Sequence, residues 1–155
     1  MKVEDIISPY GLSSSRLSLL LGNYEPLRQI SEAQLMQLIQ IARLGLPKSA
    51  AQSFLKQSGL SQKELADILN ITPRTYQLYN NDSLLGKDAS ERLIHLAVLY
   101  LKAKDVFKEQ ERIKNWLHQS LISLGGQRPI DLLDTKFGFD VVADELGRIA
   151  YGVYS

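Results

Sequence analysis

Cysteine is absent from the 155 residues of this chain, which excludes disulfide scaffolds, catalytic thiols and thiolate metal sites. Histidine occurs only at His95 and His118, which are too far apart in sequence to suggest a metal-binding motif. Four aspartates between residues 131 and 144, with Glu145, do not group on one helical face. We therefore expect a solvated acidic surface there, and neither a metal nor any other cofactor.

Long hydrophobic runs are also missing. The apolar stretch "LSLLLG" (17–22) is much too short to span a bilayer. Neither a basic segment nor a cleavage site of a secretion signal accompanies it. We therefore expect a cytoplasmic protein without membrane contact.

The chain has little excess charge of one sign. A net charge of +1 argues against a protein that coats nucleic acid by charge alone. Residues 40–105 nevertheless carry nine basic and six acidic side chains, an excess of +3. A nucleic-acid-binding region and ordinary scatter of surface charge explain this excess equally well.

Strand patterns and internal repeats are absent, so the sequence predicts an all-α protein. Residues 1–45 read as an extension that packs on the body of the chain or on a second copy. This extension includes a helix that begins with a capping box of Ser31 and Gln34 and ends at Gly45. Pro47 suits the first position of a further helix that ends at Gly59.

The stretch "GLSQKELADILNITPRTYQLY" (59–79) predicts two short helices joined by a tight turn. Ser61 and Glu64 form a capping box for the first helix. Asn70 falls at the turn and tolerates a left-handed backbone. Thr72 caps the second helix and Pro73 takes its first position. Such a helix pair is the arrangement that many DNA-binding proteins use.

The pattern within this pair separates an inner side from an outer side. Ala66 permits close approach of the two helices, and Leu65, Leu69, Ile71, Tyr76 and Tyr79 supply apolar anchors. The segment from Ser61 to Tyr79 resembles the Xre/Cro-like repressors, a resemblance that covers about residues 46–104 and implies a five-helix helix-turn-helix domain.

In that family the position of Gln62 usually holds a phosphate, and the positions of Pro73, Arg74 and Leu78 usually read bases. Only Arg74 can make the bidentate guanine contact, so DNA binding would require a dimer on a pseudo-palindrome. The alternative is a helix pair that serves only as a packing scaffold. The candidate DNA-binding residues are Gln62, Lys63, Arg74, Thr75, Gln77 and Leu78.

After residue 86, Asp88 and Glu91 predict the start of a longer helix whose apolar side includes Leu93, Leu96, Ala97 and Tyr100. In the last third, Trp116 and Leu117 should anchor a helix, and Gly125 and Gly126 should form a turn. Pro129 should begin a short helix with Leu132 and Leu133. Gly138 should break the chain before a last helix whose apolar side carries Val141, Val142, Leu146 and Ile149.

Residues 105–155 contain "LGG-x-x-P-x-x-L-L" and end with "RI-x-x-G". This segment resembles the toxin-binding domain shared by the Xre, MbcA and ParS antitoxins. With the helix pair upstream, the order of motifs resembles a Xre-type antitoxin of a RES–Xre system. The resemblance implies a RES-domain toxin as partner, which hydrolyses NAD or transfers its ADP-ribose. It also implies that the antitoxin's C-terminal end blocks the NAD pocket.

The end of the chain suits such a contact, because arginine and aromatic side chains are frequent interface anchors. The alternative is that the two tyrosines only cover the end of the last helix. The candidate toxin-binding residues are Arg148, Tyr151, Gly152, Val153, Tyr154 and Ser155.

The sequence therefore predicts an antitoxin that occludes a RES toxin and represses its own operon by binding operator DNA, as a homodimer or a larger complex with the toxin. Two alternatives stay open: a repressor without a toxin partner, and an antitoxin whose helix pair does not bind DNA. We do not expect an enzyme, because no Ser-His-Asp set, phosphate-binding loop or metal-ligand cluster is present.

Overall fold

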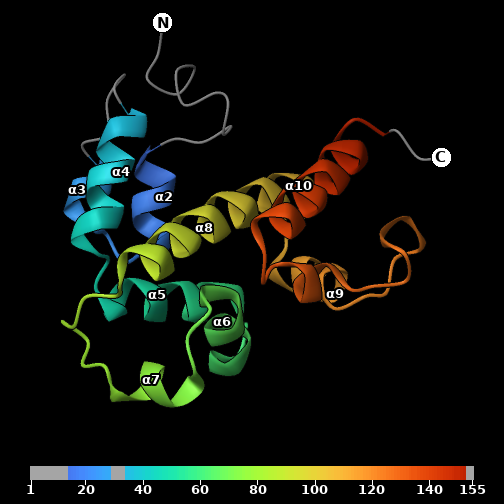
Figure 1. Ribbon diagram of the computed structural model, residues 1–155. Coiled ribbons are helices and arrows are strands. Elements are labelled where there is room, and N and C mark those ends of the chain that lie inside the picture. The colour runs from blue at the N-terminus through green and yellow to red at the C-terminus, as the bar shows by residue number, and fades with distance from the viewer. Residues whose placement is uncertain (1–13, 29–33, 153–155) are drawn as a thin grey trace, which may run out of the picture.

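The computed structural model describes residues 14–28 and 34–152, and every regular element in these ranges is a helix (Figure 1). The elements are α2 (Ser14–Leu20), α3 (Glu25–Arg28), α4 (Gln34–Leu44), α5 (Lys48–Ser58), α6 (Gln62–Leu69), α7 (Pro73–Leu78), α8 (Lys87–Phe107), α9 (Gln110–Leu117), the 3-10 helices η1 (Ile122–Leu124) and η2 (Pro129–Leu132), and α10 (Lys136–Ala150). The all-α prediction is confirmed. None of the helices in these ranges has the length and apolar character needed to cross a membrane.

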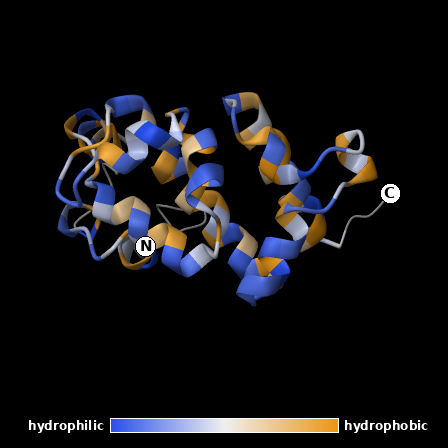
Figure 2. Ribbon diagram, turned by 90° about the horizontal axis from the view of Figure 1, so that it is seen from below, coloured by the Kyte–Doolittle hydropathy of each residue, from blue (hydrophilic) through white to orange (hydrophobic). Residues whose placement is uncertain are grey.

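Helix α8 forms the centre of the fold and contacts helices from both ends of the chain, including α4, α6, α9 and α10 (Figure 1). Its predicted apolar residues, Leu93, Leu96, Ala97 and Tyr100, are all buried. The helix begins slightly earlier than Asp88 and Glu91 predicted, because Gly86 is its cap residue and Lys87 its first helical residue. Asp88 lies inside the first turn, where its negative charge interacts favourably with the positive end of the helix dipole and stabilises the helix. Hydrophobic and hydrophilic residues intermingle along the helical ribbons (Figure 2), as amphipathic helices require.

Helices α2, α3 and α4 gather at one end of the molecule (Figure 1). Four leucines that showed no clear period in the sequence, Leu17, Leu20, Leu21 and Leu27, are buried there. Arg16 on α2 forms a two-pronged ion pair with Asp105 on α8, with distances of 2.9 and 3.3 Å. This part of the extension therefore packs on the body of the chain, which was one of the two predicted arrangements.

Four predictions for the N-terminal part and the domain boundaries have different outcomes. The capping box of Ser31 lies outside the described residues, and the domain boundaries after residues 45 and 104 stay predictions. The helix stop at Gly45 is confirmed: its φ is +92°, and a Cβ would lie 2.3 Å from the carbonyl oxygen of Leu85. Pro47 is not the first helical residue but the extended residue that precedes α5. The chain is extended at this point because Leu46 accepts a hydrogen bond from the Leu85 N–H, at 2.8 Å.

The C-terminal third follows the predicted order of elements. Trp116 and Leu117 of α9 are buried, and Gly125 and Gly126 form a turn with φ values of +68° and +82°. Pro129 opens the 3-10 helix η2. Leu133, which directly follows η2, is completely buried and fixes this short element to the core.

Two predictions for the last helix are wrong. Gly138 does not break the chain but lies in the first turn of α10, which begins after the cap residue Thr135. A Cβ at this position would lie 1.5 Å from the carbonyl oxygen of Leu132, so glycine allows α10 to pack directly against η2. Val141 does not belong to the buried side: it is 42% exposed, whereas Val142 and Leu146 are buried. The helix begins at Lys136, before Gly138, and its buried side contains Val142 and Leu146, so Val141 faces solvent.

Candidate binding surfaces

Helices α6 and α7 form the predicted helix-turn-helix, and the predicted cap and turn residues are present at the start of each helix and at the turn between them. The Ser61 hydroxyl accepts a hydrogen bond from the Glu64 N–H at 3.1 Å, and the Glu64 carboxylate accepts one from the Ser61 N–H at 3.0 Å. Asn70 has the left-handed φ of 59° that the turn requires. The Thr72 hydroxyl accepts a hydrogen bond from the Thr75 N–H at 3.0 Å, and Pro73 begins α7. All these cap and turn predictions are confirmed.

The inner side of this pair is also as predicted. Leu65, Ala66, Leu69 and Tyr76 are buried, and Ile71 and Tyr79 are partly buried against the core. Helix α7 has only six residues, so it depends on such packing for its stability.

A buried lysine holds the C-terminal end of α7. Lys48 of α5 is 7% exposed, and its ammonium group donates a hydrogen bond to the carbonyl oxygen of Tyr79 at 2.8 Å. The same group lies 4.7 Å from the centre of the Tyr76 ring, within the range of a cation–π interaction. No local sequence motif marks Lys48, because its partners are about thirty residues away.

The predicted DNA-binding residues lie mainly on the outside of the helix pair. Gln62, Lys63, Arg74, Gln77 and Leu78 are exposed, and Thr75 is partly buried. Arg74 has no ion-pair partner among the described residues, whereas Lys63 pairs with Asp67 at 2.9 Å. The Thr75 hydroxyl shares a hydrogen bond with the Thr72 hydroxyl. The exposed set therefore combines one unpaired guanidinium with amides and the apolar Leu78, which is 73% exposed.

The predicted toxin-binding residues lie at the far end of α10. Arg148 is in its last turn, Tyr151 follows the helix and is 86% exposed, and Gly152 has a left-handed φ of 68°. The Tyr151 ring is exposed and not packed on the helix end, while the alternative that both tyrosines cover this end stays open, because it also concerns Tyr154. Val153, Tyr154 and Ser155 lie outside the described residues.

Arg148 is held in place by a small polar network. Its guanidinium donates to the Glu145 carboxylate at 2.5 and 3.1 Å, and the Ser123 hydroxyl donates to the other oxygen of Glu145 at 2.8 Å. Burial raises the pKa of Glu145, but the hydrogen bonds from Arg148 and Ser123 outweigh this effect and leave the pKa below its ordinary value. The network thus keeps the carboxylate ionised and orients the arginine near the helix end.

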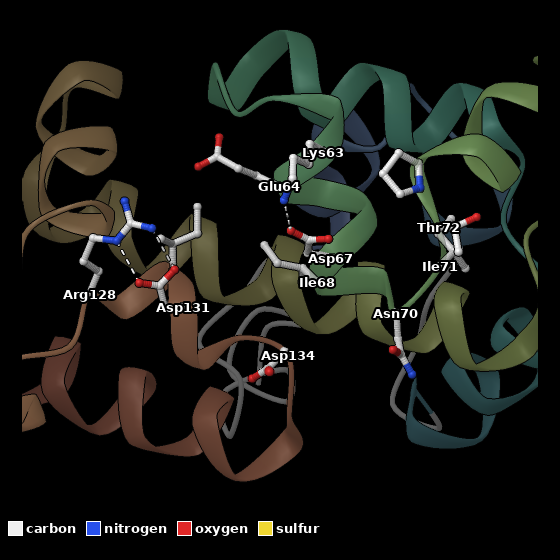
Figure 3. Close-up of a pocket in the computed structure, with 12 residues that line it drawn as sticks. Lys63, Glu64, Asp67, Ile68, Asn70, Ile71, Thr72, Arg128, Asp131 and Asp134 are labelled. Atoms are coloured by element: carbon white, nitrogen blue, oxygen red, sulfur yellow. Dashed lines mark hydrogen bonds and ion pairs between the residues drawn. The ribbon is translucent and has the colours of Figure 1, made fainter.

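A cleft of about 640 Å³ separates α6 and its turn from η2 (Figure 3). Lys63, Glu64 and Asp67 line one wall, and Arg128 and Asp131 line the other. As the dashed lines in Figure 3 show, the basic residues are paired within their own walls: Lys63 with Asp67 and Arg128 with Asp131. Within the described ranges, no group of three or more histidine, aspartate or glutamate side chains could hold a metal ion.

Beside this cleft, two side chains connect the helix pair to the C-terminal third of the chain. Nε2 of His118, at the end of α9, hydrogen-bonds the Glu64 carboxylate, while its Nδ1 lies 2.7 Å from the Lys114 carbonyl oxygen. The Arg92 guanidinium of α8 donates to the carbonyl oxygens of Ile68 and Asp134, at 3.3 and 3.0 Å. From the sequence, His118 was a candidate only for metal binding, and Arg92 was not a candidate for any role. No local pattern signals contacts over such separations.

The two sets of candidate residues lie on different parts of the molecule. Helix α7 lies at the lower edge of Figure 1, and the C-terminal end of α10 points away from it on the other side of α8. One surface can therefore be covered while the other stays accessible.

Comparison with known proteins gives two matching family models. Residues 37–98 match the antitoxin Xre-like helix-turn-helix domain, and residues 102–152 match the antitoxin Xre/MbcA/ParS C-terminal toxin-binding domain. A curated protein of Sphingobium sp. (strain YBL2), the "Prs ADP-ribosylating antitoxin", is 34% identical over 128 residues. This similarity covers 76% of the chain and 80% of the relative.

Proposed function

Because the chain belongs to the Xre/MbcA/ParS-type antitoxins, with a helix-turn-helix and a toxin-binding domain, we propose that its toxin is a NAD-consuming enzyme of the RES type. The end of α10 and the residues after it would cover the toxin's active site. The protein would act in the cytoplasm by steric occlusion and would itself catalyse no reaction.

The observation that carries this proposal is the exposed end of α10. Tyr151 is 86% exposed directly after a helix whose last arginine is oriented by Glu145. The flat ring of Tyr151 suits a subsite shaped for a nucleotide ring, and an oriented arginine beside it is a frequent interface anchor. The relative's name also supports NAD chemistry, since ADP-ribosylation uses NAD as the donor of ADP-ribose.

The test is removal of residues 150–155 from the chain, followed by co-expression with the toxin encoded beside it. We expect the shortened antitoxin to bind the toxin more weakly and to fail to restore growth. A matched control replaces residues 150–155 with alternating glycine and serine, which keeps the length but removes the side chains. Full neutralisation and equal binding by the truncated chain would show that the tail does not occlude the active site.

We also propose that α7 binds the operator of the toxin–antitoxin operon, with the antitoxin as a dimer or within a larger complex. The exposed and unpaired Arg74 supports this half of the proposal, and the exposed Leu78 could contact a thymine methyl group. A mobility-shift assay on the upstream region should give salt-dependent binding that Arg74→Ala weakens by about tenfold or more. Absent or salt-insensitive binding of the parent protein would instead favour an antitoxin that does not bind DNA.

A further inference from the structure

Helix α10 carries an exposed stripe that runs along almost its whole length. Phe137 is 84% exposed and Val141 is 42% exposed. They are spaced by four residues, and Asp144, Arg148 and Tyr151 continue the row at steps of three, four and three. Steps of three and four keep residues on one face of a helix. From Phe137 to Tyr151 the stripe is about 21 Å long, at 1.5 Å per residue.

The packing of α10 fixes this face toward solvent. Val142 and Leu146, on the opposite side, are buried in the core. Gly138 lies so close to the Leu132 carbonyl oxygen that even a methyl group would not fit. The helix therefore cannot rotate to bury Phe137 without losing the contact with η2.

A third exposed apolar side chain lies on the loop that contains η1. Ile122 is 98% exposed at the start of η1. The loop is closed by hydrogen bonds from Leu121 N–H to Gln127 O and from Gly126 N–H to Leu121 O, at 3.1 and 2.8 Å. The next residue, Ser123, is hydrogen-bonded to Glu145 of α10. Ile122 is thus presented on a closed loop whose next residue is attached to α10 at Glu145.

Large apolar residues that are this exposed and held on rigid elements mark interaction surfaces. We propose that Phe137, Val141 and Ile122 form a second toxin contact, which docks on an apolar depression of the toxin's body while the residues after α10 fill its active site. The contact rests on the function proposed above. In this proposal binding and inhibition are carried by different parts of the domain: α10 and η1 supply binding energy, and the residues after α10 inhibit the toxin.

Three observations identify the toxin as the occupant. All three residues lie within 102–152, the segment that matches the toxin-binding domain. The stripe is continuous with Arg148 and Tyr151, where the tail begins. Asp140 and Asp144 are exposed beside or within it, so the complementary surface is an apolar depression with basic residues at its rim.

The test measures binding of the full chain to the toxin encoded beside it, in a catalytically inactive form. We expect Phe137→Ser and Ile122→Ser each to weaken binding by about 30-fold, as loss of a buried anchor does. The matched control is Leu44→Ser, which removes a leucine that is 70% exposed at the end of α4. All three variants should keep the parent's melting temperature, because the replaced side chains are exposed.

A photo-crosslinking amino acid at position 137 identifies the occupant directly. Crosslinks to the toxin support the proposal. Crosslinks to a second antitoxin copy, or unchanged toxin affinity of both serine variants, would overturn it. Failure of the unmodified chain to bind the toxin would overturn the proposed function as well, so the two failures are distinguishable.

Discussion

His118 and Glu64 form a hydrogen-bonded pair that joins the end of α9 to the N-terminal cap of α6. The two side chains are 27% and 28% exposed and lie 54 positions apart in the sequence. Glu64 also accepts the hydrogen bond from Ser61 that completes the capping box. One carboxylate therefore stabilises the helix-turn-helix and attaches it to the toxin-binding domain.

A double-mutant cycle with His118→Ala and Glu64→Gln should give a coupling energy of about 0.5–1.5 kcal/mol, because the first variant removes the imidazole partner and the second removes the charge of the acceptor. Urea unfolding of the parent, both single variants and the double variant measures it. Lys63→Ala is the control, since it breaks an exposed pair with Asp67 and should cost less than about 0.5 kcal/mol. Additive effects of the two variants would show that the pair contributes nothing.

The same pair predicts the response to acid. Burial raises the pKa of Glu64, but hydrogen bonds from Ser61 and His118 bring it below its ordinary value of 4.5. The unfolded chain therefore takes up this proton at a higher pH than the folded chain. The stabilisation is complete above the ordinary pKa and is lost as the pH falls through the lower pKa of the folded state.

We therefore expect the free energy of unfolding to fall less for Glu64→Gln than for the parent between about pH 6 and about pH 3. Urea unfolding at several pH values tests this. Parallel pH curves for the two proteins would contradict the assignment of a lowered pKa to Glu64.

Two glycines of α10 should respond in opposite ways to alanine. Gly138→Ala places a methyl group against the Leu132 carbonyl and should destabilise the protein by about 2–4 kcal/mol. At Gly147 a Cβ would have no neighbour within 4 Å, so Gly147→Ala should stabilise the helix by up to about 1 kcal/mol. Thermal unfolding of both variants measures the difference, and equal effects would show that α10 does not contact η2 this closely.

Lys48 should control the stability of α7 in particular. Lys48→Met keeps the buried stem but removes the hydrogen bond to the Tyr79 carbonyl and the charge near the Tyr76 ring. Amide hydrogen exchange in α7 should then become about tenfold faster. Lys56→Met, at an exposed position on the same helix α5, is the control and should leave this exchange unchanged. Equal exchange rates in α7 for both variants would contradict the role of Lys48.

These tests concern features that the sequence predicted to different degrees. The caps at Ser61 and Thr72 and the turn at Asn70 were predictable, because each depends on residues within four positions. Gly138 was misread as a break, because its reason is a close approach to Leu132 that only the packed structure shows. The burial of Leu17 likewise depends on contacts of α2 with α5 and α8, not on a local period.

The candidate surfaces show the same division. Arg148 and Tyr151 were identified from their resemblance to a known domain and from their residue types. Phe137 and Ile122 were not, because an apolar residue near a helix start is ordinarily assigned to the core. Their exposure of 84% and 98% follows from how α10 and η1 are held, which is a tertiary property.

The central claim is that the end of the chain occludes the toxin's active site. The most direct test is NAD consumption by the purified toxin in the presence of saturating antitoxin, either intact or ending at Ile149. The account predicts that the intact chain abolishes NAD consumption, whereas the shortened chain still binds through α10 and leaves much of the activity. Equal inhibition by the two proteins at saturation would contradict the account.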